Sequence, residues 1–306
     1  MSSVYPDVIM GLNPSYYWRM NRFRGTYASS SSFYTYILEE THKDTNALNN
    51  GTLDSEGWYL NFAMPAGHET PHEKFGPIAG GDSNGMMVWD TYVRPGPRVL
   101  RVSPSSITND CPVGRNQNFS INIWFKTFSA LAASPPDTEE NIAVSGRQAG
   151  THQHFRIAES QTASGNDIRI STEAADATQG VNDSANHNQF KTTEWNMLTY
   201  TSMQGTEDET TTDGQKVYLN GKLHATFDSI WGEMLDAPGP TGDWAYLYLM
   251  CAGDSTAEVK PGSCSETALF DKVLNASQIA EIYYHATSPS PSRLRGGLYR
   301  QLGRLV

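Results

Sequence analysis

Three aromatic residues alternate along one short segment, Trp244-Ala-Tyr246-Leu-Tyr248-Leu. In a β-strand this spacing places them on one face, with the alanine and the leucines on the other. Sugars present apolar C–H faces that stack on aromatic rings, so such a stripe could bind a glycan. Packing in a core or at a subunit interface is the competing interpretation. The candidate carbohydrate-binding residues of this hypothesis are Trp244, Tyr246, Tyr248 and Trp231.

Two histidine motifs raise the question of zinc. Residues 68–72 read HETPH and match the HExxH signature, which binds zinc when both histidines share one face of a helix. Pro71 would break that helix, so zinc catalysis is not expected. His152 and His154 supply half of a zinc site, but no cysteine or carboxylate stands at ligand spacing. A surface pair is the favoured interpretation of these two histidines.

Oxygen ligands that could bind calcium are concentrated in one short region. The candidates are Asp82, Asn84 and Asp90, although the segment lacks the length and the closing glutamate of an EF-hand loop. An Asx-type turn is the favoured interpretation of this region. We therefore expect no cofactor, with a calcium ion at these residues as the alternative.

The last 20 residues, Thr287–Val306, differ in composition from the rest of the chain. A Ser-Pro repeat is followed by four arginines among leucines, with no acidic residue. A disordered basic end is one interpretation, but the regular apolar stripe favours an arm that docks on another subunit. The candidate docking residues are Arg293, Leu294, Arg295, Leu298, Tyr299, Arg300, Leu302 and Arg304.

Charge and composition limit the classes of partner. The formal net charge is −11, and all 33 acidic residues precede the arm, so we expect neither nucleic acid nor a membrane surface as partner. No apolar stretch is long enough to cross a bilayer, and no signal peptide is visible, so synthesis in a host cytoplasm is expected. Three cysteines without a CxxC pair favour neither a disulfide framework nor a zinc ribbon.

Period-two alternation recurs along the chain and predicts many short strands. In residues 118–126, Phe119, Ile121, Ile123 and Phe125 fall on one face, and polar residues with one tryptophan fall on the other. Asn220-Gly221 predicts the turn of a tight hairpin within residues 215–223. Further strands are predicted within residues 16–21, 99–103, 154–158, 167–172, 195–202, 244–251 and 266–270, and polar surface loops at 129–140 and 204–215.

One short helix is predicted near the end of the chain. Asn275 can cap it, and Gln278 stands three residues later, as in a capping box. Apolar residues at helical spacing follow, and the Ser-Pro repeat at 288–291 would end the helix.

Five segments, in order, resemble the laminin-G-like, concanavalin-type sandwich family found in bacterial and phage proteins. They are LNPSYYWRM (12–20), GPIAGG (76–81), FSINIWFKT (119–127), WNMLTYT (195–201) with KVYLNGKL (216–223), and SETALFDKVLNASQIAEIYYHA (265–286). One departure is Ser265, where the family commonly has an aspartate that makes a structural hydrogen bond. The resemblance implies an all-β fold, an antiparallel two-sheet jelly-roll sandwich with one short C-terminal helix that caps one end.

Concanavalin-like glucanases carry their catalytic carboxylates in an E-x-D-x-E pattern on one strand, and no such pattern occurs here. The acidic run Glu207-Asp208-Glu209 lies in a Thr/Gly-rich stretch, where successive side chains point apart. The sequence therefore does not favour an enzyme.

These observations predict a laminin-G-like sandwich over residues 1–286 and a basic, apolar arm over residues 287–306. The function we expect is that of a non-enzymatic virion structural protein of a tailed bacteriophage, a capsid decoration or a tail or baseplate protein. Its expected partners are other virion proteins, copies of itself, and a glycan bound by the lectin-like sandwich. The alternatives are a bacterial polysaccharide-binding module and, from another class, a glycoside hydrolase.

Overall fold

The structure is a computed structural model of the whole chain. The residues it describes are 5–30, 33–40, 58–65, 72–73, 76–79, 85–88, 100–104, 118–127, 139–146, 153–162, 165–174, 177–182, 193–203, 210–230, 246–250 and 262–288. The helices among them are α1 (Tyr5–Gly11) and α2 (Ala276–Thr287). The first eight strands are β1 (Tyr16–Ser30), β2 (Phe33–Glu40), β3 (Trp58–Pro65), β4 (His72–Glu73), β5 (Gly85–Val88), β6 (Leu100–Pro104), β7 (Phe119–Thr127) and β8 (Glu139–Gly146). The others are β9 (Gln153–Thr162), β10 (Gly165–Ala174), β11 (Ala177–Asn182), β12 (Asn196–Ser202), β13 (Thr210–Leu219), β14 (Lys222–Ile230), β15 (Tyr246–Leu249) and β16 (Gly262–Phe270).

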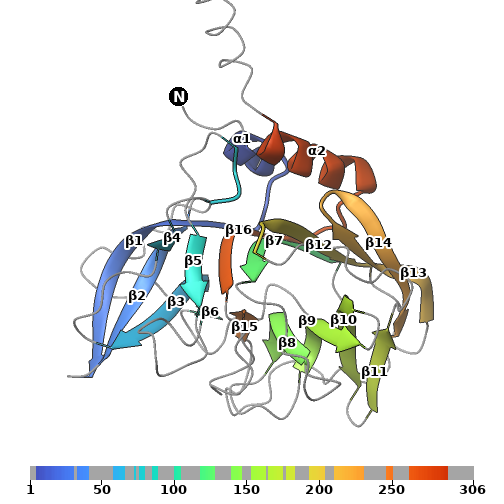
Figure 1. Cartoon of the computed structure of the whole chain (residues 1–306), viewed down its shortest axis with the longest axis horizontal. Helices are drawn as coiled ribbons and strands as arrows, with labels where there is room; N and C mark the ends of the chain where they lie inside the picture. The colour runs from blue at the N-terminus through green and yellow to red at the C-terminus, as the bar shows by residue number, and fades with distance from the viewer. Residues whose placement is uncertain are drawn as a thin grey trace, which may run out of the picture.

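The strands pair into one antiparallel hydrogen-bonded path. Its order is β11-β10-β9-β8-β15-β6-β3-β2-β1-β16-β7-β12-β13-β14, and β4 and β5 attach beside β16. In Figure 1 the path runs from β11 at the lower right, through β3 to β1 at the left, to β14 at the upper right. The predicted antiparallel, mostly β class is confirmed, whereas its division into two facing sheets stays a prediction.

Strand β7 is buried on both of its faces. The predicted apolar face is confirmed, because Phe119, Ile121, Ile123 and Phe125 are each at most 3% exposed. The opposite face, which carries Trp124 and polar residues, is also buried, because two helices cover it. Alternation in the sequence correctly placed the two faces but gave no sign of this cover.

The C-terminal helix α2 forms as the sequence predicts. Asn275 accepts a hydrogen bond from the backbone N–H of Gln278, and the Gln278 side chain accepts one from the backbone N–H of Asn275. This reciprocal pair satisfies two donors that the first turn leaves free. The helix ends at Thr287, just before the Ser-Pro repeat.

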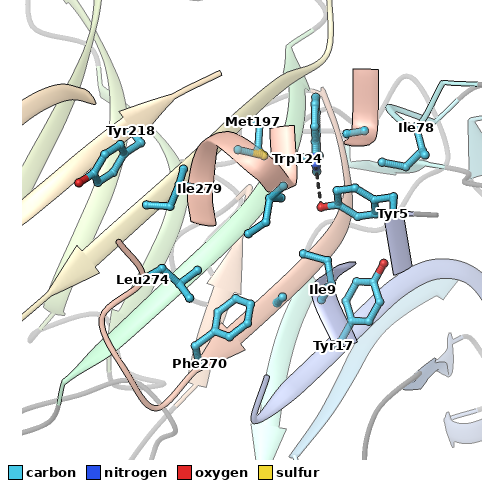
Figure 2. Packing of buried hydrophobic residues seen from close by; sticks show 13 residues of the cluster. Tyr5, Ile9, Tyr17, Ile78, Trp124, Met197, Tyr218, Phe270, Leu274 and Ile279 are labelled. Atoms are coloured by element: carbon cyan, nitrogen blue, oxygen red, sulfur yellow. Dashed lines mark hydrogen bonds between the residues drawn. The ribbon is translucent and has the colours of Figure 1, made fainter. Parts of the chain in front are cut away.

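Helix α2 packs on a face of the strands, and the expectation that it caps one end of a two-sheet sandwich stays a prediction. Helices α1 and α2 lie together on one side of β16, β7 and β12 (Figure 1). Figure 2 shows the apolar cluster that joins the helices to the strands. Its buried members are Tyr5, Ile9, Tyr17, Ile78, Trp124, Met197, Tyr218, Ala268, Phe270, Leu274, Ile279, Ile282 and Ala286. The second helix, α1, was not predicted, because seven residues are too few for a readable helical period.

The hairpin between β13 and β14 turns at Asn220-Gly221, as predicted. Both residues have positive φ, 51° and 79°, as in a type I′ turn. The Asn220 side chain accepts a hydrogen bond from the backbone N–H of Met197, which ties the turn to β12. A Cβ added at Gly221 would lie 2.8 Å from the Cβ of Tyr283 on α2, so the helix closes over the turn.

Three expectations about segments change or stay open. The stretch 204–215 was predicted as a surface loop, but β13 begins at Thr210 and reaches residue 215 as a paired strand. Its Thr-rich sequence is compatible with a strand, and cross-strand pairing with β14 decided the outcome. Likewise Glu139 and Glu140 of the predicted loop 129–140 begin β8. The predicted domain boundary after residue 286 stays a prediction.

Candidate functional site

A fully buried carboxylate, that of Glu266, lies on the face of β16 that α1 covers. Its backbone φ of 46° marks a bulge, since the register with β7 shifts between Ser265 and Ala268. The Tyr17 hydroxyl donates a hydrogen bond to Glu266, and Arg19 Nε and Nη2 each lie 3.3 Å from Glu266 Oε1. A bulge of this kind redirects a side chain, and here it places a carboxylate between a phenol and a guanidinium.

Helix α1 adds the Tyr5 hydroxyl to this buried polar network. The Tyr5 oxygen accepts hydrogen bonds from Trp124 Nε1 at 3.0 Å and from Asn122 Nδ2 at 3.3 Å. Figure 2 shows the first of these as a dashed line, with Tyr17 and Ile9 close by. Asn122 in turn accepts a hydrogen bond of 2.8 Å from Thr199 on β12. The network thus crosses from α1 to β7 and β12.

The two tyrosines of the network stay neutral well beyond their ordinary range. Burial raises the pKa of Tyr5 and of Tyr17 far above the usual value, and the negative charge of Glu266 raises both further. Neutral phenols can donate hydrogen bonds to the buried carboxylate or accept them from the indole and amide. Glu266 is the only buried acid among the described side chains, and glycoside hydrolysis needs two carboxylates. We interpret the network as one that fixes α1 on the sheet.

The predicted aromatic stripe lies on a different part of the sheet. Tyr246 and Tyr248 occupy alternate positions of β15, on the face opposite to Leu249, which is fully buried. The structure therefore brings these two candidate residues together on one face. Trp244 and Trp231 lie outside the described residues.

The neighbours of β15 separate into an apolar row and a polar row. Buried Leu249 pairs with Leu100 on β6 and with Ala143 on β8. Ala143 in turn pairs with Ile157 on β9, and Ile157 is also fully buried. In register with Tyr248 stand Arg101 on β6 and Val144 on β8, and Val144 pairs with Arg156 on β9. Arg101 and Arg156 thus stand in the same row as Tyr248.

Other predicted site residues fall in parts of the chain that the structure does not describe. The calcium candidates Asp82, Asn84 and Asp90 lie outside the described residues. The same holds for every candidate of the docking arm: Arg293, Leu294, Arg295, Leu298, Tyr299, Arg300, Leu302 and Arg304. These predictions stay open.

The histidine motifs are only partly described. His72, the last residue of the HExxH match, pairs in strand β4 with Met86, and His154 lies in β9. Within the described part of the chain, no three His, Cys, Asp or Glu residues are grouped so that they could hold a metal ion. In that same part, neither helix has the length and apolar character needed to cross a membrane.

Sequence reasoning missed the Glu266 network. The one available signal was the departure at Ser265, since an aspartate and its hydrogen bond are usual there in the family that the sequence resembles. In the structure, Ser265 Oγ donates to the backbone carbonyl of Arg19 at 3.3 Å, and the neighbouring Glu266 makes the ion pair with Arg19. Ser265 and Glu266 of β16 thus both contact Arg19 of β1.

Comparison with known proteins identifies a family. The family model described as the concanavalin A-like lectin/glucanases superfamily matches residues 103–280. None of the curated proteins compared with the sequence matches it.

Several solved structures are similar in part. Domain 4 of AbnA, a GH43 extracellular arabinanase from Geobacillus stearothermophilus, solved with arabinotriose, is 14% identical, with a TM-score of 0.39 over 65% of this chain and 81% of that domain. The binding domain of botulinum neurotoxin serotype G is 13% identical, with a TM-score of 0.45 over 72% of this chain and 48% of that one. The receptor-binding domain of botulinum neurotoxin D is 16% identical, with a TM-score of 0.39 over 60% and 41%.

Proposed function

Because this chain belongs to the concanavalin A-like lectin/glucanase superfamily, we propose that it is a non-enzymatic polysaccharide-binding module. The glycan binds on the face of β15 that carries Tyr246 and Tyr248. The observation that supports this choice is the register that sets both tyrosines opposite to buried Leu249. A two-sheet jelly roll is part of the proposal, with the path from β11 to β6 forming much of one sheet.

The composition of the two rows favours contact of the tyrosine face with solvent. The row of Leu249 continues through Ala143 and Ile157 to Ile170, all apolar. The row of Tyr248 contains two arginines, a residue type found far more often on protein surfaces than in cores. This composition supports the proposed contact with solvent. Aromatic rings on such a face can stack against sugar rings, contributing about 1 kcal/mol each.

The test is to replace Tyr248 and measure binding to a panel of soluble polysaccharides by affinity electrophoresis. Tyr248→Ala should weaken binding several-fold and leave the midpoint of thermal unfolding within a few degrees of the parent protein. Tyr284→Ala is the matched control, because Tyr284 is an exposed tyrosine on α2 and not on β15. If Tyr248→Ala unfolds the protein, the stripe belongs to the core. If binding is unchanged, the glycan does not stack there.

The expected place on a phage particle stays a prediction. It was based on the family resemblance, the lack of a visible signal peptide, the acidic body and the docking arm, and the residues of the arm lie outside the described part of the chain. The absence of enzymatic activity belongs to the proposal. Its support is that Glu266, the buried acid among the described side chains, is already engaged by Arg19 and Tyr17. Release of reducing sugar from any polysaccharide that the protein binds would overturn it.

A further inference from the structure

We propose that Asn220 is a deamidation site, that β12 and α2 slow its reaction in the folded protein, and that its product no longer fits under α2. In deamidation, the backbone nitrogen of the next residue attacks the side-chain carbonyl carbon of an asparagine. The side-chain nitrogen leaves as ammonia with the proton of the attacking N–H, and a cyclic succinimide forms. Water then opens the ring to aspartate or isoaspartate. Glycine in the next position favours the attack because it has no side chain to crowd the nitrogen, and Gly221 follows Asn220.

Three hydrogen bonds tie Asn220 to β12. Its backbone N–H donates to the Met197 carbonyl at 2.8 Å, and its Oδ1 accepts from the Met197 N–H at 2.9 Å. Its Nδ2 donates to Asn196 Oδ1 at 3.2 Å. To react, the side-chain amide must rotate until its carbonyl carbon faces the Gly221 nitrogen. This rotation breaks both side-chain hydrogen bonds, so the folded hairpin should react slowly.

Helix α2 restrains the same turn from the other side. In Figure 1, one end of α2 lies against the β13–β14 hairpin. A Cβ at Gly221 would lie 2.8 Å from Tyr283 Cβ, and the Tyr283 ring stacks on Trp124 with 5.9 Å between the ring centroids. The backbone of the turn therefore has little room to change shape while α2 is docked. We expect the reaction to proceed in molecules whose helix has moved away.

The products do not fit the place of Asn220. An aspartate has an oxygen where Nδ2 donated, and that oxygen would face Asn196 Oδ1. Asn196 keeps its orientation because its Nδ2 donates to the Glu194 carbonyl at 2.9 Å. An isoaspartate adds a methylene to the main chain, next to a position with no space for a Cβ beside Tyr283. The modification therefore opposes the return of α2.

The first experiment measures deamidation of the full-length protein by peptide mass spectrometry, in buffer and in concentrated urea. Three Asn-Gly pairs occur, at 50–51, 84–85 and 220–221, and in urea they should react at similar rates. Asn220 should react about tenfold or more slowly in buffer than in urea, because the folded state must first break its hydrogen bonds. Equal rates at Asn220 in the two solvents would refute the proposal.

The second experiment tests the part played by α2. Ile282→Ala removes a fully buried side chain of the helix and should raise the rate at Asn220 in buffer about fivefold. Tyr284→Ala, at an exposed position of the same helix, should leave the rate unchanged. Hydrogen exchange of the α2 amides should increase with the rate at Asn220, while exchange in β7 shows that the sheet stays folded. An unchanged rate in Ile282→Ala would show that α2 does not control the reaction.

The third experiment tests the product. Asn220→Asp should lower the thermal midpoint and speed hydrogen exchange in α2, because it replaces the donor to Asn196 with an oxygen. Asn118→Asp makes the same change at an exposed residue and should do neither. An Asn220→Asp protein with the parent's thermal midpoint and α2 exchange would overturn the claim that the product opposes docking.

Discussion

Strand β7 and strand β15 use the same period of two and end in different environments. On β7 the apolar positions face one side, and the positions between them carry Ser120, Asn122 and Trp124, all buried. On β15, buried Leu249 stands in the row of Ala143 and Ile157, and Tyr248 stands in register with Arg101. The difference is that α1 and α2 cover the second face of β7.

The comparison teaches that polar residues on one face of a strand need hydrogen-bond partners. Their spacing in the sequence does not show whether water or other parts of the protein provide those partners. Asn122 finds its partners in Tyr5 of α1 and Thr199 of β12. For the row of Tyr248, the proposed function supplies solvent and a glycan as the partners. Experiments that damage one face and spare the other test this distinction.

The largest expected effect is on the covered face. Glu266→Ala should lower the free energy of unfolding by about 3–5 kcal/mol, because it leaves the Arg19 guanidinium and the Tyr17 hydroxyl buried without their carboxylate. Urea denaturation followed by fluorescence measures the loss. Glu281→Ala, at an exposed position of α2, is the control and should cost less than about 1 kcal/mol. A loss below 1 kcal/mol for Glu266→Ala would mean that the network does not hold α1.

Alkaline pH should also lower the free energy of unfolding through the covered face, with a smaller effect for each residue than Glu266→Ala. The folded protein keeps the protons of Tyr5 and Tyr17, since their pKa values are raised, whereas the unfolded chain loses them near pH 10. Their stabilising contribution is therefore complete below pH 10 and declines above it, by about 1.4 kcal/mol for each tyrosine at pH 11. Denaturation curves at pH 9, 10 and 11 measure the decline. In Tyr5→Phe the loss of unfolding free energy at pH 11 should be smaller by the contribution of one tyrosine, about 1.4 kcal/mol. An identical pH dependence in Tyr5→Phe would contradict the assigned burial.

The smallest effect on stability is expected on the face of β15. Tyr248→Ala should change the free energy of unfolding by about 0.5 kcal/mol or less, the usual range for surface substitutions. Tyr17→Ala, the same substitution on the covered face, should cost about 3–5 kcal/mol because Tyr17 is fully buried. Chemical denaturation of the two variants side by side gives the contrast directly. Similar losses in both would erase the distinction between the two faces.

Much of the fold could be predicted from local signals in the sequence. Strand β7, the hairpin at Asn220-Gly221 and the capped start of α2 each depend on residues a few positions apart, and each was predicted where the structure places it. Helix α1 and the cover over β7 depend on contacts between residues more than a hundred positions apart, such as Tyr5 and Trp124. No local period carries that information.

The candidate sites show the same limit. Alternation predicts one face for Tyr246 and Tyr248, and their binding role stays a prediction. Residue spacing could not show that Arg101 and Arg156 stand in the row of Tyr248, because pairing across β6, β8 and β9 sets that neighbourhood. Glu266 was passed over because a single acidic residue in a strand looks exposed. Its burial follows from a bulge and from Arg19, and neither is visible in residue spacing.

The contact between Gly221 and Tyr283 has a consequence for engineering this protein. Tips of β-hairpins are usually good places to insert a peptide tag, a fluorophore site or new chain termini, because they project into solvent. Here the tip lies under α2, with no room for even one methyl group beside Tyr283. An insertion at residues 220–221 would lift the C-terminal helix from the sheet and expose the apolar surface beneath it. For display or labelling, this hairpin is the wrong place to open the chain.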